Sequence, residues 1–279
     1  MRYDFSDRIQ ASEFSKAFYR EIDERFFSDV QTFMPWREIP FDPLLDFASL
    51  HDKDVLEIGV GNGSHAQLIS SFARSYTGID LTEYAVKSTT KRLQHLDSQG
   101  DRTGKNVKLM RMDAENMDFP EASFDLVWSW GVIHHSANTR KVLEEIYRVL
   151  KPGGVAITMV YHRNLWNYYI FAGLFGGIYQ ATRLKSFSVH KARQRLIDGA
   201  LARYYSIAEW KALVGDLFSV DEVKIYGSKS ELIPLPNGKL KAAAKALIPN
   251  SFSRLLTNRC RMGMFLVSAL KKPNAVTNS

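Results

Sequence analysis

The chain has 279 residues, of which 45% are hydrophobic and 12% aromatic, enough to bury one sizeable core. No run of about 18 apolar residues occurs, so the sequence predicts no membrane-spanning helix. The single cysteine, Cys260, excludes an intramolecular disulfide and is typical of a reducing compartment. The first residues, MRYDFSDRIQ, lack the apolar stretch of a secretory signal. We therefore expect a soluble, cytoplasmic protein.

The formal net charge is +7, which is compatible with nucleic acid or another anionic partner. The lysines and arginines are scattered along the chain, with one denser stretch, KLKAAAKALIPNSFSRLLTNRCR, over 239–261. A scattered excess favours solubility and an acidic small ligand over a nucleic-acid surface. We expect neither nucleic acid nor stable membrane insertion, and homodimerisation is left open.

The N-terminal region has the pattern of one amphipathic helix. Phe14, Phe18, Ile22 and Phe26 recur every four residues, which predicts a helix over about 10–30. Three prolines between 35 and 43 then predict a connector. We interpret residues 1–50 as an N-terminal helical lid.

Strand and helix patterns alternate regularly from residue 54 to residue 162. Such alternation predicts an α/β fold with parallel pairing and helices on both faces of the sheet. Lys151-Pro152-Gly153-Gly154 is expected to stop the last of these helices. We assign 51–162 to a cofactor-binding core. Its predicted strands are 54–58, 75–80, 107–113, 124–131 and 155–162, and its predicted helices are 64–73, 82–96 and 139–150.

The regular pattern lapses after Arg163. The aromatic stretch NLWNYYIFAGLFGGIY and the basic residues that follow predict a helical cap insertion over 163–205. Ser206 and Glu209 then have the spacing of a capping box that opens a helix. The remainder of the core, 206–279, holds two more strand patterns, FSVDEVKIYG and MGMFLVSAL, which flank a second insertion at 228–262.

Three glycines, Gly59, Gly61 and Gly63, follow the first predicted strand. Glycines there let backbone N–H groups approach a ligand, and the next helix offers its N-terminus to the same place. The stretch from Gly61 to Ala66 formally fits a dinucleotide fingerprint, with Asp80 near the position of a ribose-binding acid. An NAD-dependent oxidoreductase is therefore one alternative, although the extra Gly59 and the acid Glu57 count against it.

The motifs taken in order resemble those of class I S-adenosylmethionine-dependent methyltransferases. They are EIGVGNG at 57–63, GID at 78–80, MDAENMDFP at 112–120, FDLVWSWGVIHHSANT at 124–139 and KPGG at 151–154. The phrases WSWGVIHH, VLKPGG and MVYHRN are most similar to bacterial small-molecule methyltransferases. The resemblance is strong over about 54–160 and loose over 200–270. It implies a Rossmann-like, seven-stranded, mostly parallel sheet whose last strand runs antiparallel, with the cap insertions added.

The resemblance also implies which residues bind the cofactor, S-adenosyl-L-methionine. The glycines would flank its methionine part, Asp80 would accept from the ribose hydroxyls, and Asp113 would lie at the adenine. An aromatic face at Trp130 could favour the sulfonium through a cation–π contact. The implied cofactor set is Glu57, Gly59, Gly61, Gly63, Asp80, Leu81, Asp113, Ala114, Glu115 and Trp130.

Histidines are the candidates for proton transfer from an acceptor. His134 and His135 follow the fourth predicted strand and His162 ends the fifth, so all three lie at the carboxyl edge of the predicted sheet. They lack a carboxylate or cysteine companion, so we expect no metal site. Acceptor-binding candidates from the cap insertion are Trp166, Tyr169, Arg203 and Tyr204.

The sequence thus predicts methyl transfer to an oxygen or nitrogen of a small-molecule acceptor by in-line displacement. Secondary-metabolite, sugar and lipid-precursor acceptors all fit. The alternatives are an RNA or protein methyltransferase, the NAD-dependent oxidoreductase, and a non-catalytic protein that keeps the cofactor pocket.

Overall fold

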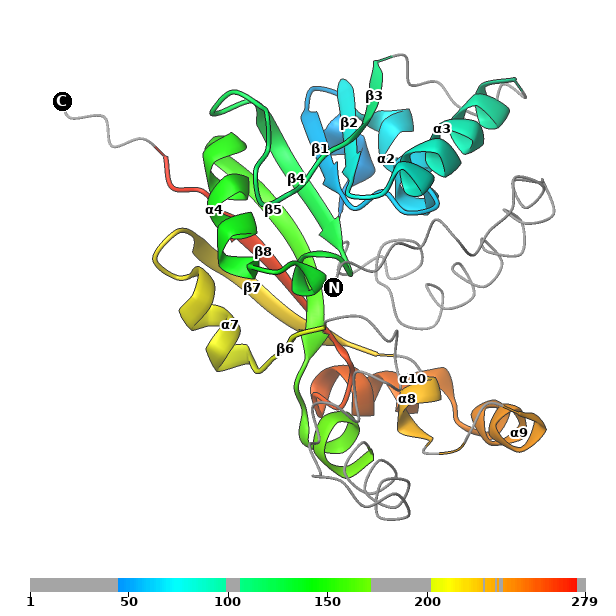
Figure 1. The fold of residues 1–279 in the computed structure, drawn as a ribbon. Coiled ribbons are helices and arrows are strands. Elements are labelled where there is room, and N and C mark those ends of the chain that lie inside the picture. The colour runs from blue at the N-terminus through cyan, green and yellow to red at the C-terminus, as the bar shows by residue number, and fades with distance from the viewer. Residues whose placement is uncertain are drawn as a thin grey trace, which may run out of the picture.

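A computed structural model gives the fold and describes residues 45–98, 106–171, 202–227, 229–233, 235 and 238–274 (Figure 1). The predicted N-terminal helix and most of the cap insertion lie outside these residues. None of the described helices is long and apolar enough to cross a membrane.

A single mostly parallel sheet forms the centre of the fold. Its main path has the strand order β3-β2-β1-β4-β5-β8-β7, in which β8 runs antiparallel to both of its neighbours. A two-residue strand, β6, pairs with the end of β5 and brings the total to eight rather than the expected seven. The strands are β1 (Asp54–Ile58), β2 (Ser75–Asp80), β3 (Val107–Arg111), β4 (Phe124–Trp130), β5 (Leu150–His162), β6 (Tyr204–Tyr205), β7 (Ser219–Tyr226) and β8 (Phe265–Lys271).

Helices cover both faces of this sheet because each strand carries apolar side chains on both faces. On one face, α2 (Ser64–Phe72) and the short 3-10 helix η3 (Phe47–Leu50) pack on a cluster that includes Val55 and Trp128. On the other face, α4 (Thr139–Val149) and α7 (Ile207–Val214) pack on a cluster built around Leu56, Ile146 and Trp210. Strand burial on two sides is expected for parallel sheets.

Two helix starts follow the expected capping chemistry. Ser206 and Glu209 form a complete capping box at the start of α7. The helix α3 (Glu83–Ser98) begins after Thr82, whose hydroxyl accepts a hydrogen bond from the Ala85 backbone N–H at 3.3 Å.

The fifth strand is longer than the pattern predicts. It begins at Leu150, directly after α4, and includes the KPGG stretch. Gly153, with a φ of +77°, adopts the left-handed conformation inside this strand, and the pairing with β4 shifts register near Leu126. The helix α4 ends at Val149, before KPGG as expected, and KPGG itself forms the distorted start of β5.

The insertion between β7 and β8 is helical where it is described. In Figure 1 its helices lie together below the sheet, close to the π-helix η5 (Leu165–Phe171) that follows β5. They are α8 (Lys229–Leu232), α9 (Lys239–Leu247), α10 (Asn250–Arg254) and the π-helix η6 (Leu255–Arg259).

A buried hydroxyl joins α7 to the antiparallel part of the sheet. Ser268 on β8 accepts from the Trp210 indole N–H at 2.9 Å and shares a hydrogen bond with Thr158 on β5 at 2.8 Å. All three residues are buried. Ser268 therefore satisfies two polar groups that have no access to water.

We predict that Ser268→Ala lowers the free energy of unfolding by about 2–4 kcal/mol, because it leaves the Trp210 and Thr158 groups buried without this partner. Urea unfolding measures the change. Ser219→Ala, which removes an exposed hydroxyl from β7, is the control and should stay within about 0.5 kcal/mol. A Ser268→Ala protein as stable as the control would contradict the role of this hydroxyl.

Candidate active site at the carboxyl edge of the sheet

The glycine turn after β1 lies against the turn after β4. Gly59 donates a backbone hydrogen bond to the Ile79 carbonyl at 2.8 Å and has a φ of +85°. A Cβ atom at this position would lie 2.1 Å from Cγ2 of Val132, so only glycine permits the contact. Gly61 is different, because a Cβ there would meet nothing within 4 Å. Val132 thus fills the space over Gly59, whereas the space over Gly61 is empty of protein atoms.

Asp80 ends β2 and connects the glycine turn to the start of α3. One carboxylate oxygen accepts from the Gly61 N–H at 3.2 Å, and the other accepts from the Thr82 N–H at 2.9 Å and hydroxyl at 3.0 Å. Leu81, next in the chain, has an exposed side chain, and its carbonyl accepts from Arg111. The predicted ribose-binding acid is therefore held in place beside Gly61.

Asp113 lies beside Asp80 along the same edge. The Met112 N–H donates to the Asp80 carbonyl at 2.9 Å, which joins the ends of the two neighbouring strands. Asp113 itself accepts from the Glu115 N–H at 2.9 Å. The Glu115 carboxylate accepts from the Asn138 N–H at 3.0 Å, at the start of α4. Ala114 packs against the core between them.

Glu57 lies beneath the glycine turn and is almost fully buried. The Tyr76 hydroxyl donates to its carboxyl group at 2.5 Å. Burial and, to a smaller extent, the nearby Asp80 outweigh the lowering effect of the Tyr76 hydrogen bond and together raise the pKa of Glu57 to about 8. Glu57 is therefore predominantly protonated at neutral pH.

His65 is a site residue that the sequence analysis missed. It lies in the first turn of α2, two residues after Gly63, with Nδ1 3.8 Å from a carboxyl oxygen of Glu57. The Trp128 indole N–H donates to the same Nδ1 at 3.3 Å. Burial, assisted by Arg92, lowers the pKa of His65 to about 3. The distance to Glu57 alone suggests an ion pair, but both pKa directions favour the neutral forms, so the contact is one between neutral groups.

Trp130 belongs to an aromatic stack on the same face. Its ring stacks on Trp128 with centroids 5.3 Å apart and an angle of 8° between planes, and His65 approaches its edge. It is half-buried and packs against the core cluster of this face. Trp130 is the last residue of β4, and its neighbour His65 lies just after the glycine turn.

The turn after β4 brings the histidine pair together. His134 and His135 lie in the short 3-10 helix η4 (Ile133–His135), with ring centroids 4.2 Å apart. His134 is fully buried against Tyr161, and neither of its ring nitrogens has a hydrogen-bond partner within the described residues. Burial and the neighbouring His135 hold the pKa of His134 well below its usual range. The ring is thus neutral at pH 7, so one of its nitrogens can accept a proton and the other carries one.

Arg203 fixes this histidine turn and is not a free cation. Its backbone N–H donates to the His134 carbonyl at 3.0 Å, and its guanidinium donates to the carbonyls of Ser136 and Ala137. The Arg203 guanidinium, which the sequence predicts to bind an acceptor, therefore binds backbone carbonyls of the turn.

His162 points away from the histidine pair. Its Nδ1 makes a hydrogen bond with the Gly263 carbonyl at 3.0 Å, and burial lowers its pKa. Successive side chains of a strand point to opposite faces, and it is Tyr161 that contacts His134. The structure therefore brings together two of the three predicted histidines.

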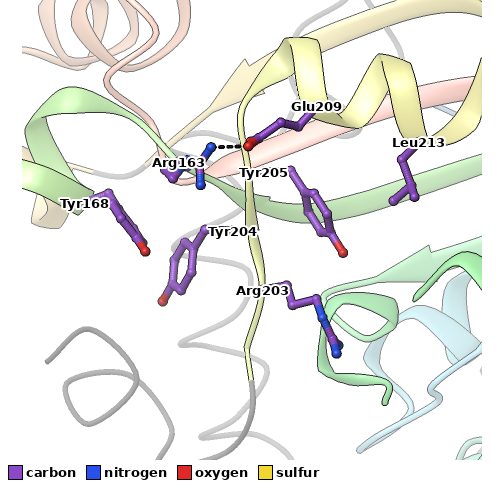
Figure 2. A pocket seen from close by; sticks show the side chains of 7 residues that line it. All are labelled: Arg163, Tyr168, Arg203, Tyr204, Tyr205, Glu209 and Leu213. Atoms are coloured by element: carbon purple, nitrogen blue, oxygen red, sulfur yellow. Dashed lines mark hydrogen bonds and ion pairs between the residues drawn. The ribbon is translucent and has the colours of Figure 1, made fainter. Parts of the chain in front are cut away.

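A cavity of about 340 Å³ opens beside β6 and η5, which both contribute lining residues (Figure 2). Figure 2 shows Tyr204 and Tyr205 pointing to opposite sides of β6, with the Arg163–Glu209 ion pair at one end. The lining residues are Arg163, Tyr168, Arg203, Tyr204, Tyr205, Glu209 and Leu213.

An aromatic row connects this cavity to the histidine pair. Tyr161 contacts His134 and stacks on Tyr204 with centroids 5.3 Å apart. Tyr204 in turn contacts Tyr168 at 5.1 Å. None of the predicted cofactor-binding residues lines the cavity, whereas two of the predicted acceptor-binding residues, Arg203 and Tyr204, do.

Two predicted acceptor residues lie outside this cavity. The Trp166 indole N–H donates to the Glu231 carbonyl at 3.2 Å, which ties η5 to α8. Tyr169 is half exposed and contacts Tyr168. Within the described ranges, no group of three or more His, Cys, Asp or Glu side chains is placed to hold a metal ion.

Comparison with known proteins identifies the domain to which this edge belongs. A family model described as a methyltransferase domain matches residues 56–158, from β1 into β5. A solved structure titled as an S-adenosylmethionine dependent methyltransferase from Mesorhizobium loti has the same fold, with a TM-score of 0.52 and 16% identity over 82% of this chain and 94% of that chain. Residues 56–158 thus match a methyltransferase domain, and the fold around them is that of a class I S-adenosylmethionine-dependent methyltransferase.

Two curated relatives of the methyltransferase domain are themselves named as methyltransferases. The phthiotriol/phenolphthiotriol dimycocerosates methyltransferase of Mycobacterium tuberculosis (strain ATCC 25618 / H37Rv) is 37% identical over 109 residues, 38% of this chain and 36% of that protein. The sterol 24-C-methyltransferase erg-4 of Neurospora crassa is 35% identical over 104 residues, 37% of this chain and 26% of that protein. The chain therefore spans about a third or less of the length of these relatives.

The site geometry fits the cofactor of a methyltransferase domain. Open space over Gly61 leaves room for a ligand at the turn, and the acids at the ends of β2 and β3 lie along the same edge. The buried, unpartnered His134 lies in the adjoining turn.

We predict that Gly59→Ala lowers the free energy of unfolding by about 2–5 kcal/mol, because it adds left-handed backbone strain to an overlap with Val132. Val132→Ala should recover at least about 1 kcal/mol in the Gly59→Ala protein, whereas alone it should destabilise. Chemical denaturation of the four proteins of this cycle measures the coupling. Gly61→Ala is the control, with no coupling to Val132. Strictly additive effects of Gly59→Ala and Val132→Ala would refute the contact.

We predict a pH-dependent gain of stability for Glu57→Gln. The folded protein keeps the Glu57 proton up to about pH 8, whereas the unfolded chain releases it near 4.5. The carboxyl group therefore favours folding most below pH 4.5, and this contribution is lost as the pH rises through 8. Relative to the wild type, Glu57→Gln should gain about 3–5 kcal/mol in stability between pH 5 and 9.

Unfolding by denaturant at each pH measures this difference. Glu121→Gln is the matched control, because it makes the same replacement at an exposed position. A Glu57→Gln difference that stays constant from pH 5 to 9 would show that the buried carboxyl group is already ionised at low pH.

Proposed function

We propose that this domain transfers a methyl group to an oxygen or nitrogen of a small-molecule acceptor, with His134 or His135 as the proton acceptor. The observation that carries the proposal is the buried His134 ring, neutral and without partners for its nitrogens among the described residues. A buried polar group without partners costs free energy, so its presence beside a cofactor turn favours a functional role.

The cofactor would be held by the glycine turn and the neighbouring strand ends. Gly59, Gly61 and Gly63 would flank its methionine part, and when bound it supplies an electrophilic methyl group. The Asp80 carboxylate would accept from the ribose hydroxyls, with Leu81 beside it. Asp113, Ala114 and Glu115 would border the adenine. Glu57 would support the turn from below and Trp130 would border the sulfonium side.

The histidine pair would remove a proton from the acceptor. Because burial keeps His134 neutral, a ring nitrogen can accept a proton from a hydroxyl or ammonium group at pH 7. Arg203 holds the carbonyls of the turn, so the ring position is fixed before the acceptor arrives. We assign proton transfer to this pair and not to His162, which is bound to the Gly263 carbonyl.

The acceptor would enter from the tyrosine-lined cavity. Tyr168, Tyr204 and Leu213 offer it aromatic and aliphatic surface, and among the described lining residues the charges come from two arginines and one glutamate. Such a lining suits a molecule with an apolar or aromatic body, which agrees with the sterol in the name of one relative. Trp166 and Tyr169 would border this entrance from η5.

The competing functions lack a specific observation in their favour. The family match to a methyltransferase domain argues against the NAD-dependent oxidoreductase. The aromatic cavity favours a small molecule over RNA or protein. A non-catalytic protein that keeps the pocket would have no use for the buried His134.

We predict that His134→Leu keeps the fold and the cofactor affinity but lowers turnover by about 10²–10⁴-fold. Leucine fills the same buried space, and it removes ring nitrogens that have no partner in the described residues, so stability should not fall. Calorimetric titration with S-adenosylhomocysteine, with NAD⁺ in parallel, measures binding. Methylated product from an acceptor panel, identified by mass, measures turnover.

His95→Ala on α3 is the control, with unchanged binding and turnover. In the wild type, the acidic limb of the pH–rate profile should lie below pH 6.5, because the pKa of His134 is lowered. Binding of NAD⁺ without S-adenosylhomocysteine would overturn the cofactor assignment. Full turnover by both His134→Leu and His135→Leu proteins would overturn the histidine assignment.

A further inference from the structure

Exposed apolar side chains are concentrated at one end of the described structure. Eight large hydrophobic side chains are exposed among the described residues, and only Phe72 and Leu81 lie on the cofactor half. The other six lie in η5 and in the insertion between β7 and β8. They are Leu165, Tyr169, Leu240, Leu247, Phe252 and Leu255.

The helix α9 shows its apolar side to solvent. Leu240 and Leu247 are seven residues apart, which is two helical turns, so they lie on one side of the helix with Ala243 and Ala244 between them. Their exposed fractions are 71% and 84%. An ordinary surface helix buries such a stripe against the core, and α9 exposes it.

Basic side chains flank the same stripe. Lys239, Lys241 and Lys245 occupy the remaining sides of α9, and the stretch 239–261 holds six lysines and arginines and no acid. Lys241 is partly buried, and burial together with Lys245 lowers its pKa. Positive charges are therefore crowded beside exposed leucines, an arrangement that an anion would stabilise.

The exposed residues of η5 and of the insertion belong to one body. The hydrogen bond from Trp166 to the Glu231 carbonyl connects η5 to α8, and in Figure 1 both lie together below the sheet with α9 and α10. Tyr168 of η5 lines the acceptor cavity, and Tyr169, the next residue, is exposed. The exposed apolar residues therefore begin beside the cavity.

We propose that α9, with α10 and η5, docks on the surface of an anionic lipid bilayer. Exposed leucines would enter the boundary between headgroups and acyl chains, while lysines would extend along the helix to reach the phosphates. The stretch 239–261 carries six cations and no acid, and Glu231 on α8 is an acidic neighbour of Lys241, so a net positive charge remains. Such a charge matches an anionic surface, at roughly 1 kcal/mol for each cation that reaches it. Nucleic acid would satisfy the charges but would leave the leucines of α9 in water.

This docking does not require methyl transfer. It would also bring an apolar acceptor close to the cavity, and only this delivery of the acceptor rests on the proposed function. The test therefore measures vesicle binding without turnover. The full chain is sedimented with vesicles of phosphatidylcholine alone and with vesicles that contain about 30% phosphatidylglycerol, at about 0.1 M salt.

We expect partitioning onto the anionic vesicles to be at least about tenfold stronger than onto the neutral ones. Leu240→Ser/Leu247→Ser should lower it about tenfold or more, because both side chains are exposed and their loss leaves the fold intact. Ala242→Ser/Ala246→Ser, on the opposite side of the same helix, is the matched control and should bind as the wild type does.

Charge-reversal variants show whether the lysines of α9 bind the vesicles themselves or only add to the net charge of the protein. Lys239→Glu/Lys245→Glu on α9 should weaken binding to the anionic vesicles, and the same change at Lys87 and Lys91 on α3 should weaken it far less. Equal loss from both pairs, or binding that the leucine variant does not lower, would overturn the proposal. A gel shift with RNA that outcompetes the vesicles and does not depend on the leucines would assign the segment to nucleic acid instead.

Discussion

The contact between Gly59 and Val132 is the constraint on which the site depends. β1 and β4 are parallel neighbours, so the turns that follow them leave the sheet at the same edge. Without a Cβ at position 59, the two turns touch, and the histidines that follow Val132 lie beside the cofactor turn. Any larger residue would push the turns apart. If the domain works as proposed, the proximity of methyl donor and proton acceptor depends on the absence of a Cβ atom at position 59, and small misplacements are costly in catalysis.

The polar groups beneath this contact are kept neutral. Glu57, Tyr76 and His65 are buried together, and their surroundings favour the uncharged forms of all three at neutral pH. A neutral cluster avoids the large cost of burying an unpaired charge. It also leaves Asp80, at the rim, as the acid that contacts the glycine turn directly. Charge is therefore withheld from the layer below the turn.

The sequence predicts the sheet well because its information is local. The strand ends that carry Asp80 and Asp113 follow from short apolar runs, and the capping box at Ser206 follows from four residues. The acceptor side depends on contacts between distant residues. Arg203 has the charge of a substrate-binding residue, but its partners are carbonyls at Ser136 and Ala137. No local pattern reveals that Tyr161, Tyr204 and Tyr168 form one row. His65 offered a signal in its position just after the last glycine of the turn.

The antiparallel pairing of β7 with β8 has a consequence for how such proteins diversify. Tyr226 and Phe265 are direct partners, so the chain leaves the sheet and returns to it at the same point. The segment between them, including α8 to η6, therefore connects two paired strands. Changing the length of such a connection costs little free energy, since the entropy of closing a loop grows slowly with its length. Evolution could replace the whole segment from α8 to η6 while the parallel strands kept their register. Where the protein resides and which molecules it meets could then change independently of its chemistry.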